Sequence, residues 1–225
     1  MNNVGFRIFP VKREVPLSIL KEYENFATPH LSDNMHRLNG VGSSIFPIHT
    51  KKKLLGTAIT VKTRPGDNLL VHKAISMGGD NDVIIVDAGG DLNNAIIGEL
   101  MVRTAKKRGI KGFIINGAIR DSAEIKELNY PVYAKGIVHK GPYKDGPGEI
   151  NVPIQIGGVL INPGNIILGD MDGIVSVPSE VSKDIVPKVK ELIKKEEEMV
   201  DSIEKNNLDT SWINQRLKKK GCKDV

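Results

Sequence analysis

Two short runs of uninterrupted apolar residues constrain the fold of this chain more than any other feature. Residues 83–86 read VIIV and residues 113–115 read FII. A strand that is apolar at every position is buried on both faces, which is typical of parallel sheets. The segment between the runs carries apolar or small residues at a helical spacing, at positions 97, 100, 101, 104 and 105. The pattern therefore predicts a right-handed β-α-β crossover in an α/β fold.

The remaining chain adds strands and short helices around this unit. Residues 54–63 are rich in β-branched side chains and predict a strand, followed by a PGDN turn and a short helix from about 69 to 76. Two more short helices are expected, one after Pro16 and one at 29–38. After residue 131, short apolar runs alternate with Gly, Pro and Asn turns. They predict a β-rich second layer from the runs at 132–134, 154–161, 166–168 and 174–177.

The chain is predicted to be one domain over residues 1–225, with a C-terminal helical extension over about 180–225. Apolar side chains recur there at a helical period, at Ile185, Val189, Leu192, Met199 and Ile203. Glu196 falls on this stripe, whereas Glu197 and Glu198 do not. An acid on an apolar helix face either interrupts the apolar stripe or contacts another surface, such as that of a neighbouring subunit.

Composition excludes several classes of protein. The only cysteine is Cys222, so neither an intramolecular disulfide nor a cysteine-rich metal cage is possible. The net charge of +5 comes from basic residues spread along the chain, with few aromatic residues among them, so we do not expect nucleic-acid binding. No apolar stretch approaches the roughly 20 residues that span a bilayer, and no secretory signal precedes residue 16. We expect a cytoplasmic protein without a membrane segment.

Polar residues follow both predicted strands at their carboxyl ends. The first run is followed by Asp87 and, after two glycines, by Asp91. The second is followed by Asn116 and then by adjacent Arg120 and Asp121. Parallel strands end at one edge of a sheet, and ligands of such folds bind beyond that edge. We therefore expect these residues to share one edge with the start of the intervening helix.

That helix start, at residues 98–101, would add backbone donors. Unpaired N–H groups at a helix start attract anions, and Gly98 would let an anion approach closely. The carboxylates of Asp121 and Glu99, without a cluster of Cys or His, suit Mg²⁺ or Mn²⁺ rather than zinc. A small 2-oxo acid fits these groups, with its carboxylate on the backbone donors and its keto oxygen facing the metal and Arg120. An enolate formed there would be stabilised by both cations.

Each of these features also has an ordinary structural interpretation. Taken without other context, Arg120 and Asp121 are more typical of a solvated loop pair than of a site. Glu99 precedes Arg103 by four residues, so the two can form a surface helix pair. The five histidines are scattered along the sequence and indicate no metal site.

The segment Gly98-Glu99-Leu100-Met101 and the later Arg120-Asp121 resemble the signature of the 4-hydroxy-4-methyl-2-oxoglutarate aldolase family. That family also contains the regulator of ribonuclease E activity A. The resemblance extends over roughly residues 25–180 and is carried by four further stretches. They are PGDN at 65–68, GIKGFIINGAIRD at 109–121, YPVYAKG at 130–136 and NPGNIILGDMDGIVSVP at 162–178.

The resemblance implies a metal-dependent pyruvate aldolase on an αββα sandwich, assembled as a homotrimer or homohexamer. It implies that Gly98, Glu99, Leu100 and Met101 bind substrate, chiefly through main-chain amides. Arg120 would bind pyruvate and its enolate, and Asp121 would hold the divalent metal, partly through waters. Many members also decarboxylate oxaloacetate. A glutamate from a neighbour's C-terminal helix reaches the site in the longer aldolases, and Glu196 is our candidate for it here.

Two departures from the family pattern concern the same edge. Glu99 stands where the family often has aspartate, and Asn116 stands where some aldolases carry aspartate. The longer side chain of Glu99 keeps the charge but shifts its position.

Two functions of different classes compete. The first is a pyruvate-releasing lyase, in which Arg120, Glu99 and Glu196 are catalytic and Asp121 holds the metal. The second is a non-catalytic protein-binding regulator of ribonuclease E-type RNA processing. The regulatory branch is expected to lack the carboxylate that Asp121 supplies, so its presence here favours the lyase. A sugar- or phosphate-binding module would use the same helix start without needing Asp121.

Overall fold

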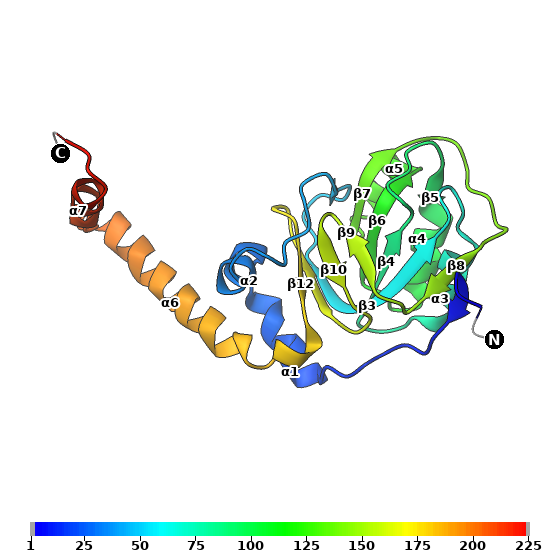
Figure 1. The fold of residues 1–225 in the computed structure, drawn as a ribbon, viewed down its shortest axis with the longest axis horizontal. Helices are drawn as coiled ribbons and strands as arrows, with labels where there is room; N and C mark the ends of the chain where they lie inside the picture. Colours follow the sequence, from blue (N-terminus) through cyan, green and yellow to red (C-terminus); the bar gives the residue numbers. More distant parts are fainter. Residues whose placement is uncertain (1–2, 224–225) are drawn as a thin grey trace. The chain divides into compact units, whose positions relative to one another are not determined.

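A computed structural model describes residues 3–223 and contains one large mixed sheet (Figure 1). The order of its main path is β1-β8-β3-β4-β6-β7-β2, and β5, β11 and β12 join it at the side. The strands on that path are β1 (Phe6–Ile8), β2 (Phe46–Pro47), β3 (Leu54–Thr63), β4 (Asp82–Asp87), β6 (Gly112–Ile119), β7 (Val132–Ile137) and β8 (Gly148–Ile150). The others are β5 (Ala95–Ile97), β11 (Ile166–Gly169) and β12 (Ile174–Val177), and β9 (Ile154–Ile156) and β10 (Val159–Ile161) form a separate hairpin.

The predicted crossover forms the centre of the sheet. Strand β4 pairs in parallel with β6, in a register that aligns Val83 with Gly112 and Asp87 with Asn116. Strands β3 and β7 flank this pair, also in parallel. All four positions of the first apolar run, residues 83–86, are fully buried. Burial on both faces explains why that run has no polar alternation.

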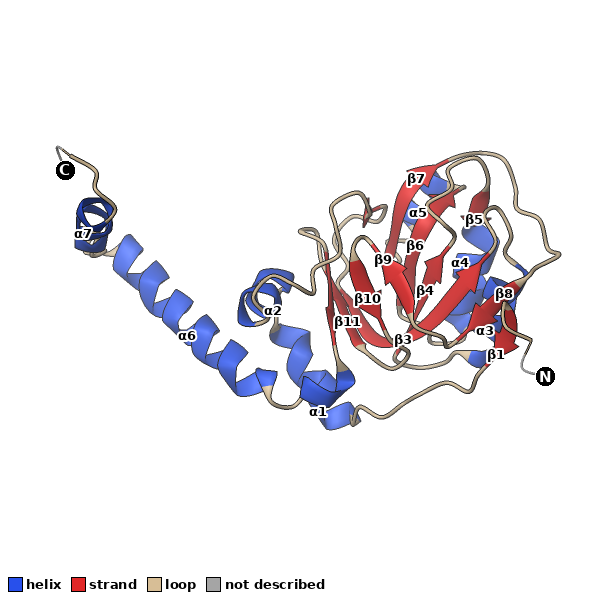
Figure 2. Cartoon of the chain, in the orientation of Figure 1, coloured by secondary structure: helices blue, strands red, loops and turns tan. Residues whose placement is uncertain are grey.

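Helices cover one face of the sheet and strands cover the other (Figures 1 and 2). The helices on the first face are α3 (Leu69–Met77), α4 (Glu99–Lys107) and α5 (Ser122–Glu127). They share one apolar core with alternate residues of β3, β4 and β6. The opposite residues of these strands pack against β9, β10 and β11 in a second core. Helix α2 (Thr28–Asn34) packs against β12, which completes an α/β/β/α order of layers.

Several element boundaries differ from the sequence prediction. Residue 97 belongs to β5 rather than to the crossover helix, which begins at Glu99. Leu100 was expected on the buried face but is 74% exposed, because Met101, Val102 and Ala105 form the buried stripe instead. The run at 132–134 is predicted in the second layer but forms β7, which pairs with β6 in the central sheet. The runs at 166–168 and 174–177 pack in the second core with β9 and β10, yet they stay hydrogen-bonded to the central sheet through the pairing of β11 with β3.

The chain divides into two compact units, Met1–Val186 and Pro187–Val225. The first also holds α1 (Leu17–Glu22) and the two 3-10 helices η1 (Tyr23–Asn25) and η2 (Ser179–Val181). The second holds nearly all of α6 (Ile185–Glu204) and the whole of α7 (Ser211–Lys219). Glu196 is an exposed residue of α6. No helix among residues 3–223 is long and apolar enough to cross a membrane.

Candidate active site

Strand β6 delivers Arg120 and Asp121 beside the start of α4. The strand runs four residues further than the apolar run indicated, because β5 pairs with its last two positions, Ala118 and Ile119. The Arg120 N–H then donates to the Ile97 carbonyl at 3.0 Å. This bond holds the segment after β6 against the segment that enters α4. The geometry expected from two strands ending at one edge is therefore present.

The Asp121 carboxylate sits on the first amide of α4. Its Oδ2 accepts a hydrogen bond from the Glu99 N–H at 3.0 Å and lies 3.7 Å from Arg120 Nε. Asp121 adopts a left-handed backbone conformation, with φ 55° and ψ 42°. Such a conformation costs a non-glycine residue about 1 kcal/mol, so the surrounding contacts hold this side chain at the helix start.

This contact alters one part of the sequence interpretation. The amides of residues 98–101 were expected to be open to an anion, but Glu99 donates to Asp121 and Met101 donates to the Gly98 carbonyl. A carboxylate is a favourable partner for a helix start, so at the Glu99 amide Asp121 takes the place that an incoming anion would use. Substrate binding by the other amides of residues 98–101 stays a prediction.

Gly98 is required by the closeness of these side chains. A Cβ atom at this position would lie 2.4 Å from Asp121 Oδ2 and 3.0 Å from Arg120 Cγ and Nε. The Gly98 backbone is extended, a conformation open to any residue. A larger side chain is therefore excluded by steric contact and not by backbone strain. The space that was predicted at Gly98 for a ligand is thus occupied by the side chains of Asp121 and Arg120.

The two charged side chains open onto a pocket of about 190 Å³. The Arg120 side chain is 43% exposed and the Asp121 side chain 37% exposed, so both can meet a ligand. Apolar walls and a second cation complete the lining, which consists of Asn68, His72, Ile96, Ile97, Gly98, Leu100, Met101, Arg120, Asp121, Pro142 and Lys144. The volume suits a small organic acid.

Three polar lining residues were missed by the sequence analysis: Asn68, His72 and Lys144. The Asn68 amide group donates to the Ile96 carbonyl at 2.9 Å, and among residues 3–223 nothing donates to its buried Oδ1. Burial, followed by the nearby Lys144 ammonium, lowers the pKa of His72 below its ordinary value. Asn68 closes the PGDN stretch but was given no role in a site, and no local motif marks His72 or Lys144. The reason is that α3 and the loop after β7 are brought together only by the tertiary fold.

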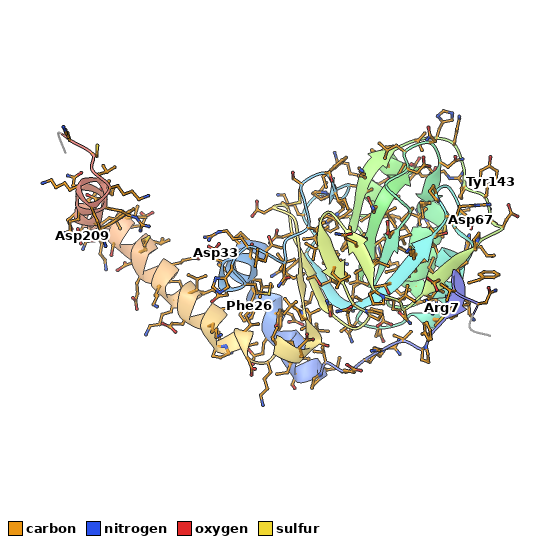
Figure 3. The ribbon with its side chains drawn as sticks, viewed as in Figure 1. Arg7, Phe26, Asp33, Asp67, Tyr143 and Asp209 are labelled. Carbon is orange, nitrogen blue, oxygen red and sulfur yellow. The ribbon has the colours of Figure 1, made fainter. Side chains whose placement is uncertain are left out.

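The loop that carries Lys144 is anchored by a buried carboxylate. Asp67 is fully buried and accepts backbone N–H bonds from Leu69 at 3.0 Å, Asp145 at 2.7 Å and Gly146 at 2.9 Å. Figure 3 shows Asp67 and Tyr143 in the same region, where residues 67 and 143 form an isolated parallel bridge. The PGDN turn therefore fixes one wall of the pocket. Burial alone would raise the pKa of Asp67, but these donors together with the Arg64 guanidinium hold it below its usual value.

Replacing Asp67 by asparagine is expected to lower the free energy of unfolding by about 3 kcal/mol at neutral pH, since amide hydrogens would face the Asp145 and Gly146 donors. The folded protein holds the pKa of Asp67 below its value in the unfolded chain. The Asp67 carboxylate therefore contributes its full stabilisation at pH values above the pKa of the unfolded chain, and this stabilisation is lost as the pH falls through the pKa of the folded protein. The gap between wild type and Asp67→Asn in urea titrations should therefore shrink below about pH 4. Glu127→Gln, a change at an exposed carboxylate, is the control. A gap that is constant with pH would contradict this account.

The other predicted acids lie in local contacts. The Glu99 carboxylate accepts from Arg103 Nε at 2.7 Å, the surface helix pair that the spacing also allowed. Asp91 accepts from the Asn93 side chain at 2.6 Å and from the Asn94 N–H at 3.3 Å within its own loop. Glu196 belongs to the second unit, so its reach toward a neighbouring subunit stays a prediction.

The donor set fits a divalent ion that keeps most of its water. Among residues 3–223 no group of three or more Asp, Glu, His or Cys side chains could enclose a metal. Mg²⁺ is commonly held by only one or two carboxylates with waters completing its shell. Asp121 is half-buried at the pocket and lies in a cradle that a Cβ at Gly98 would fill. Asp121 would be the one protein ligand of such an ion, and waters would complete its shell.

The fold and this pocket define a class: an α/β protein with a pocket lined by charged side chains at the carboxyl edge of its central parallel strands. A family model described as RraA-like, aldolase/RraA, matches residues 28–176. The chain therefore belongs to the RraA-like family. Its relatives include both enzymes and regulators by name.

One relative is a putative 4-hydroxy-4-methyl-2-oxoglutarate aldolase of Halalkalibacterium halodurans. It is 37% identical over 177 residues, covering 79% of this chain and 84% of the relative. A 4-hydroxy-4-methyl-2-oxoglutarate aldolase of Thermus thermophilus is 36% identical over 116 residues, which are 52% of this chain and 71% of that enzyme. Among solved structures, the RNA-processing inhibitor RraA from Thermus thermophilus has a TM-score of 0.64 at 30% identity, covering 68% of this chain and 93% of that one.

Proposed function

We propose that this protein is a divalent-metal-dependent lyase that releases pyruvate from a 4-hydroxy-2-oxo acid of the 4-hydroxy-4-methyl-2-oxoglutarate type. The observation that carries the proposal is the placement of Arg120 and Asp121 together at the start of α4, on a pocket of about 190 Å³. The names of the aldolase relatives support the same reaction class. We further propose that the enzyme decarboxylates oxaloacetate.

Both reactions pass through the enolate of pyruvate. In the retro-aldol cleavage the C4 hydroxyl loses its proton, the C3–C4 bond breaks, and its electron pair moves onto the C2 carbonyl as an enolate. In the decarboxylation the bond from C3 to the leaving carboxylate breaks and releases carbon dioxide, with the same result. Protonation at C3 then gives pyruvate in either case. A fixed positive charge at the C2 oxygen therefore serves both substrates.

The side chains around the pocket have distinct roles in this proposal. Arg120 stays charged at any working pH and donates to the C2 oxygen and the adjacent carboxylate. The Lys144 ammonium, a second cation in the pocket lining, attracts the distal carboxylate of the substrate. A divalent ion at Asp121 would polarise the same carbonyl as a Lewis acid. Glu99, oriented by Arg103, would hold the water that moves protons, and Glu196 would approach from a neighbouring subunit of a homotrimer or homohexamer.

The direct test is a pyruvate assay coupled to lactate dehydrogenase, with oxaloacetate or a racemic 4-hydroxy-4-methyl-2-oxoglutarate as substrate. Turnover should require Mg²⁺ or Mn²⁺ and should fall to the uncatalysed rate after chelation, returning when the metal is restored. Because Mg²⁺ itself accelerates oxaloacetate decarboxylation, a protein-free reaction at the same metal concentration is subtracted. Equal turnover with and without chelator would refute the metal-dependent lyase.

A second prediction concerns the steric effect of a methyl group at Gly98. Replacing Gly98 by alanine keeps every functional group but places a methyl group against Asp121 and Arg120. A displacement of about 1 Å at a reacting group can reduce turnover on the order of 10²-fold, and we expect a loss of that size in kcat/KM. Gly40→Ala is the matched control, since its added Cβ would meet nothing nearer than 4.0 Å. Wild-type activity in Gly98→Ala would show that the close packing at the helix start is not part of the site.

A regulator of RNA processing is the second proposed function. Its support is the likeness to the RNA-processing inhibitor RraA. The presence of Asp121 favours the lyase, because a protein-binding surface has no need of a carboxylate held in this position. Tagged protein should be tested for capture of ribonuclease E-type assemblies. Capture that is unchanged in an Asp121→Asn variant, together with absence of turnover, would establish the regulator instead.

A further inference from the structure

A second and larger cavity lies at the edge of the sheet opposite the candidate active site. Its volume is about 480 Å³, within the range of pockets that bind small molecules. Four of its lining residues stand at the amino ends of neighbouring parallel strands: Leu55 in β3, Asn81 before β4, Lys111 before β6 and Tyr130 before β7. The candidate active site lies beyond the carboxyl ends of the same strands. The two sites are therefore separate.

The cavity concentrates positive charge. Five lysines line it, and Glu24 is the only carboxylate among its lining residues; the lysines are Lys21, Lys52, Lys53, Lys106 and Lys111. Among residues 3–223 none of these five forms an ion pair. Two acids outside the lining lie near it: Asp80, beside Gly109, and Asp170, whose charge acts on Lys53. The charge is thus left for a ligand to neutralise.

Lys53 is the most enclosed of the five. Its ammonium group donates to the Glu24 carbonyl at 2.8 Å, which fixes the position of the group at the cavity. Burial lowers the pKa of Lys53, against the opposing effects of Asp170 and Glu24. A partly desolvated ammonium interacts more strongly with an anion than an exposed one does.

The floor of the cavity is apolar and rigid. Leu20, Ile110 and Tyr130 are each buried, with exposures of 6%, 2% and 2%. The Tyr130 hydroxyl donates to the Ile110 carbonyl at 2.6 Å, which fixes the floor. Apolar lining residues together with five lysines match a ligand with an organic body and several negative charges.

We propose that this cavity binds a small organic polyphosphate, with its phosphates on the lysines and its organic body on the floor of Leu20, Ile110 and Tyr130. Lysine ammonium groups act as point charges and bind phosphate without the planar fork by which arginine pairs with carboxylates. All five cations here are lysines. Helix α4 contributes to both sites, with Glu99 at its first turn and Lys106 in its last.

The proposal is tested by titrating the full-length protein with ATP in a calorimeter, at low salt and with EDTA present. The double variant Lys52→Glu/Lys106→Glu reverses two exposed charges at the cavity, and Lys73→Glu/Lys126→Glu makes the same change in net charge at exposed positions outside it. We expect the first to weaken ATP binding at least about tenfold and the second by less than about twofold. Equal weakening in both would reveal a diffuse surface attraction and overturn the site.

Further probes identify the ligand chemistry. Inorganic triphosphate supplies the charges without the organic body, and citrate supplies carboxylates in place of phosphates. The proposal requires ATP to bind more tightly than triphosphate, and triphosphate more tightly than citrate; any other order overturns the assigned class. Bound ATP should also protect Lys53 and Lys111 from acetylation, as read by mass spectrometry. The Asp121→Asn variant should bind ATP as tightly as the wild type does. The outcome of the ATP titration therefore does not depend on whether the protein is a lyase.

Discussion

Replacing Asp121 by alanine is expected to abolish metal-dependent pyruvate release. Asp121 is the one carboxylate among the residues that line the pocket, and no group of three or more metal-binding side chains exists among residues 3–223 to take its place. A metal that polarises a carbonyl contributes several kcal/mol to transition-state stabilisation, which corresponds to a loss on the order of 10³-fold or more in kcat/KM. The measurement is the coupled assay with saturating Mg²⁺.

Alanine at this position also removes a helix cap, so a second variant must separate the two effects. Asp121→Asn keeps an oxygen to accept from the Glu99 N–H and tolerates the left-handed backbone, yet it carries no charge. We expect it to melt close to the wild-type temperature while losing nearly as much activity as alanine. If Asp121→Asn retained wild-type turnover, the capping bond and not the charge would be the function of Asp121.

The central part of the fold was predictable because burial on both faces leaves a strong trace in sequence. The runs at 83–86 and 113–115 lie in two adjacent parallel strands, and the strand expected over residues 54–63 is β3 with the same bounds. A strand with no solvent face has no polar alternation, and few other structures produce such a run. The αββα expectation came from the family resemblance, and the layer order agrees with it.

The errors arose where short segments fit two patterns equally well. Strand β5 has three residues, and Ile97 also falls at the spacing of the α4 stripe formed by Met101 and Ala105. Strand β8 begins at Gly148, inside the sequence GPGE, which is typical of a turn. In both cases the pairing partner decides the structure, and that partner is distant in the chain.

The site was only partly predictable for a related reason. Adjacent charges after a buried strand indicated Arg120 and Asp121, since strand ends are where such folds bind ligands. The left-handed backbone at Asp121 has no sequence signal, so its bond to the Glu99 amide was not foreseen. Lys144 reaches the pocket only because Asp67 ties its loop to the PGDN turn. That link is a tertiary contact between segments far apart in sequence.

Replacing Arg120 by lysine is expected to reduce kcat on the order of 10²- to 10³-fold, as removal of a single oxyanion donor does in other enzymes. Lysine retains the charge but lacks the guanidinium fork. The position of the Arg120 guanidinium also depends on the length of its side chain. Its Nε lies 3.7 Å from Asp121, and its Nη1 lies 3.1 Å from where a Cβ on Gly141 would stand. A lysine ammonium has one donor centre and cannot meet both the enolate oxygen and the neighbouring carboxylate.

The division between kcat and KM distinguishes the roles that Arg120 could have. An interaction made only with the enolate lowers kcat and leaves KM nearly unchanged, whereas one made equally with substrate and transition state raises KM alone. Arg108→Lys, at an exposed arginine whose guanidinium donates to the Ser76 carbonyl, is the matched control and should leave both constants within about twofold. A rise in KM with unchanged kcat in Arg120→Lys would make Arg120 a substrate anchor. The enolate would then depend on the metal at Asp121 for its stabilisation, and the loss in Asp121→Asn should exceed that in Arg120→Lys by orders of magnitude.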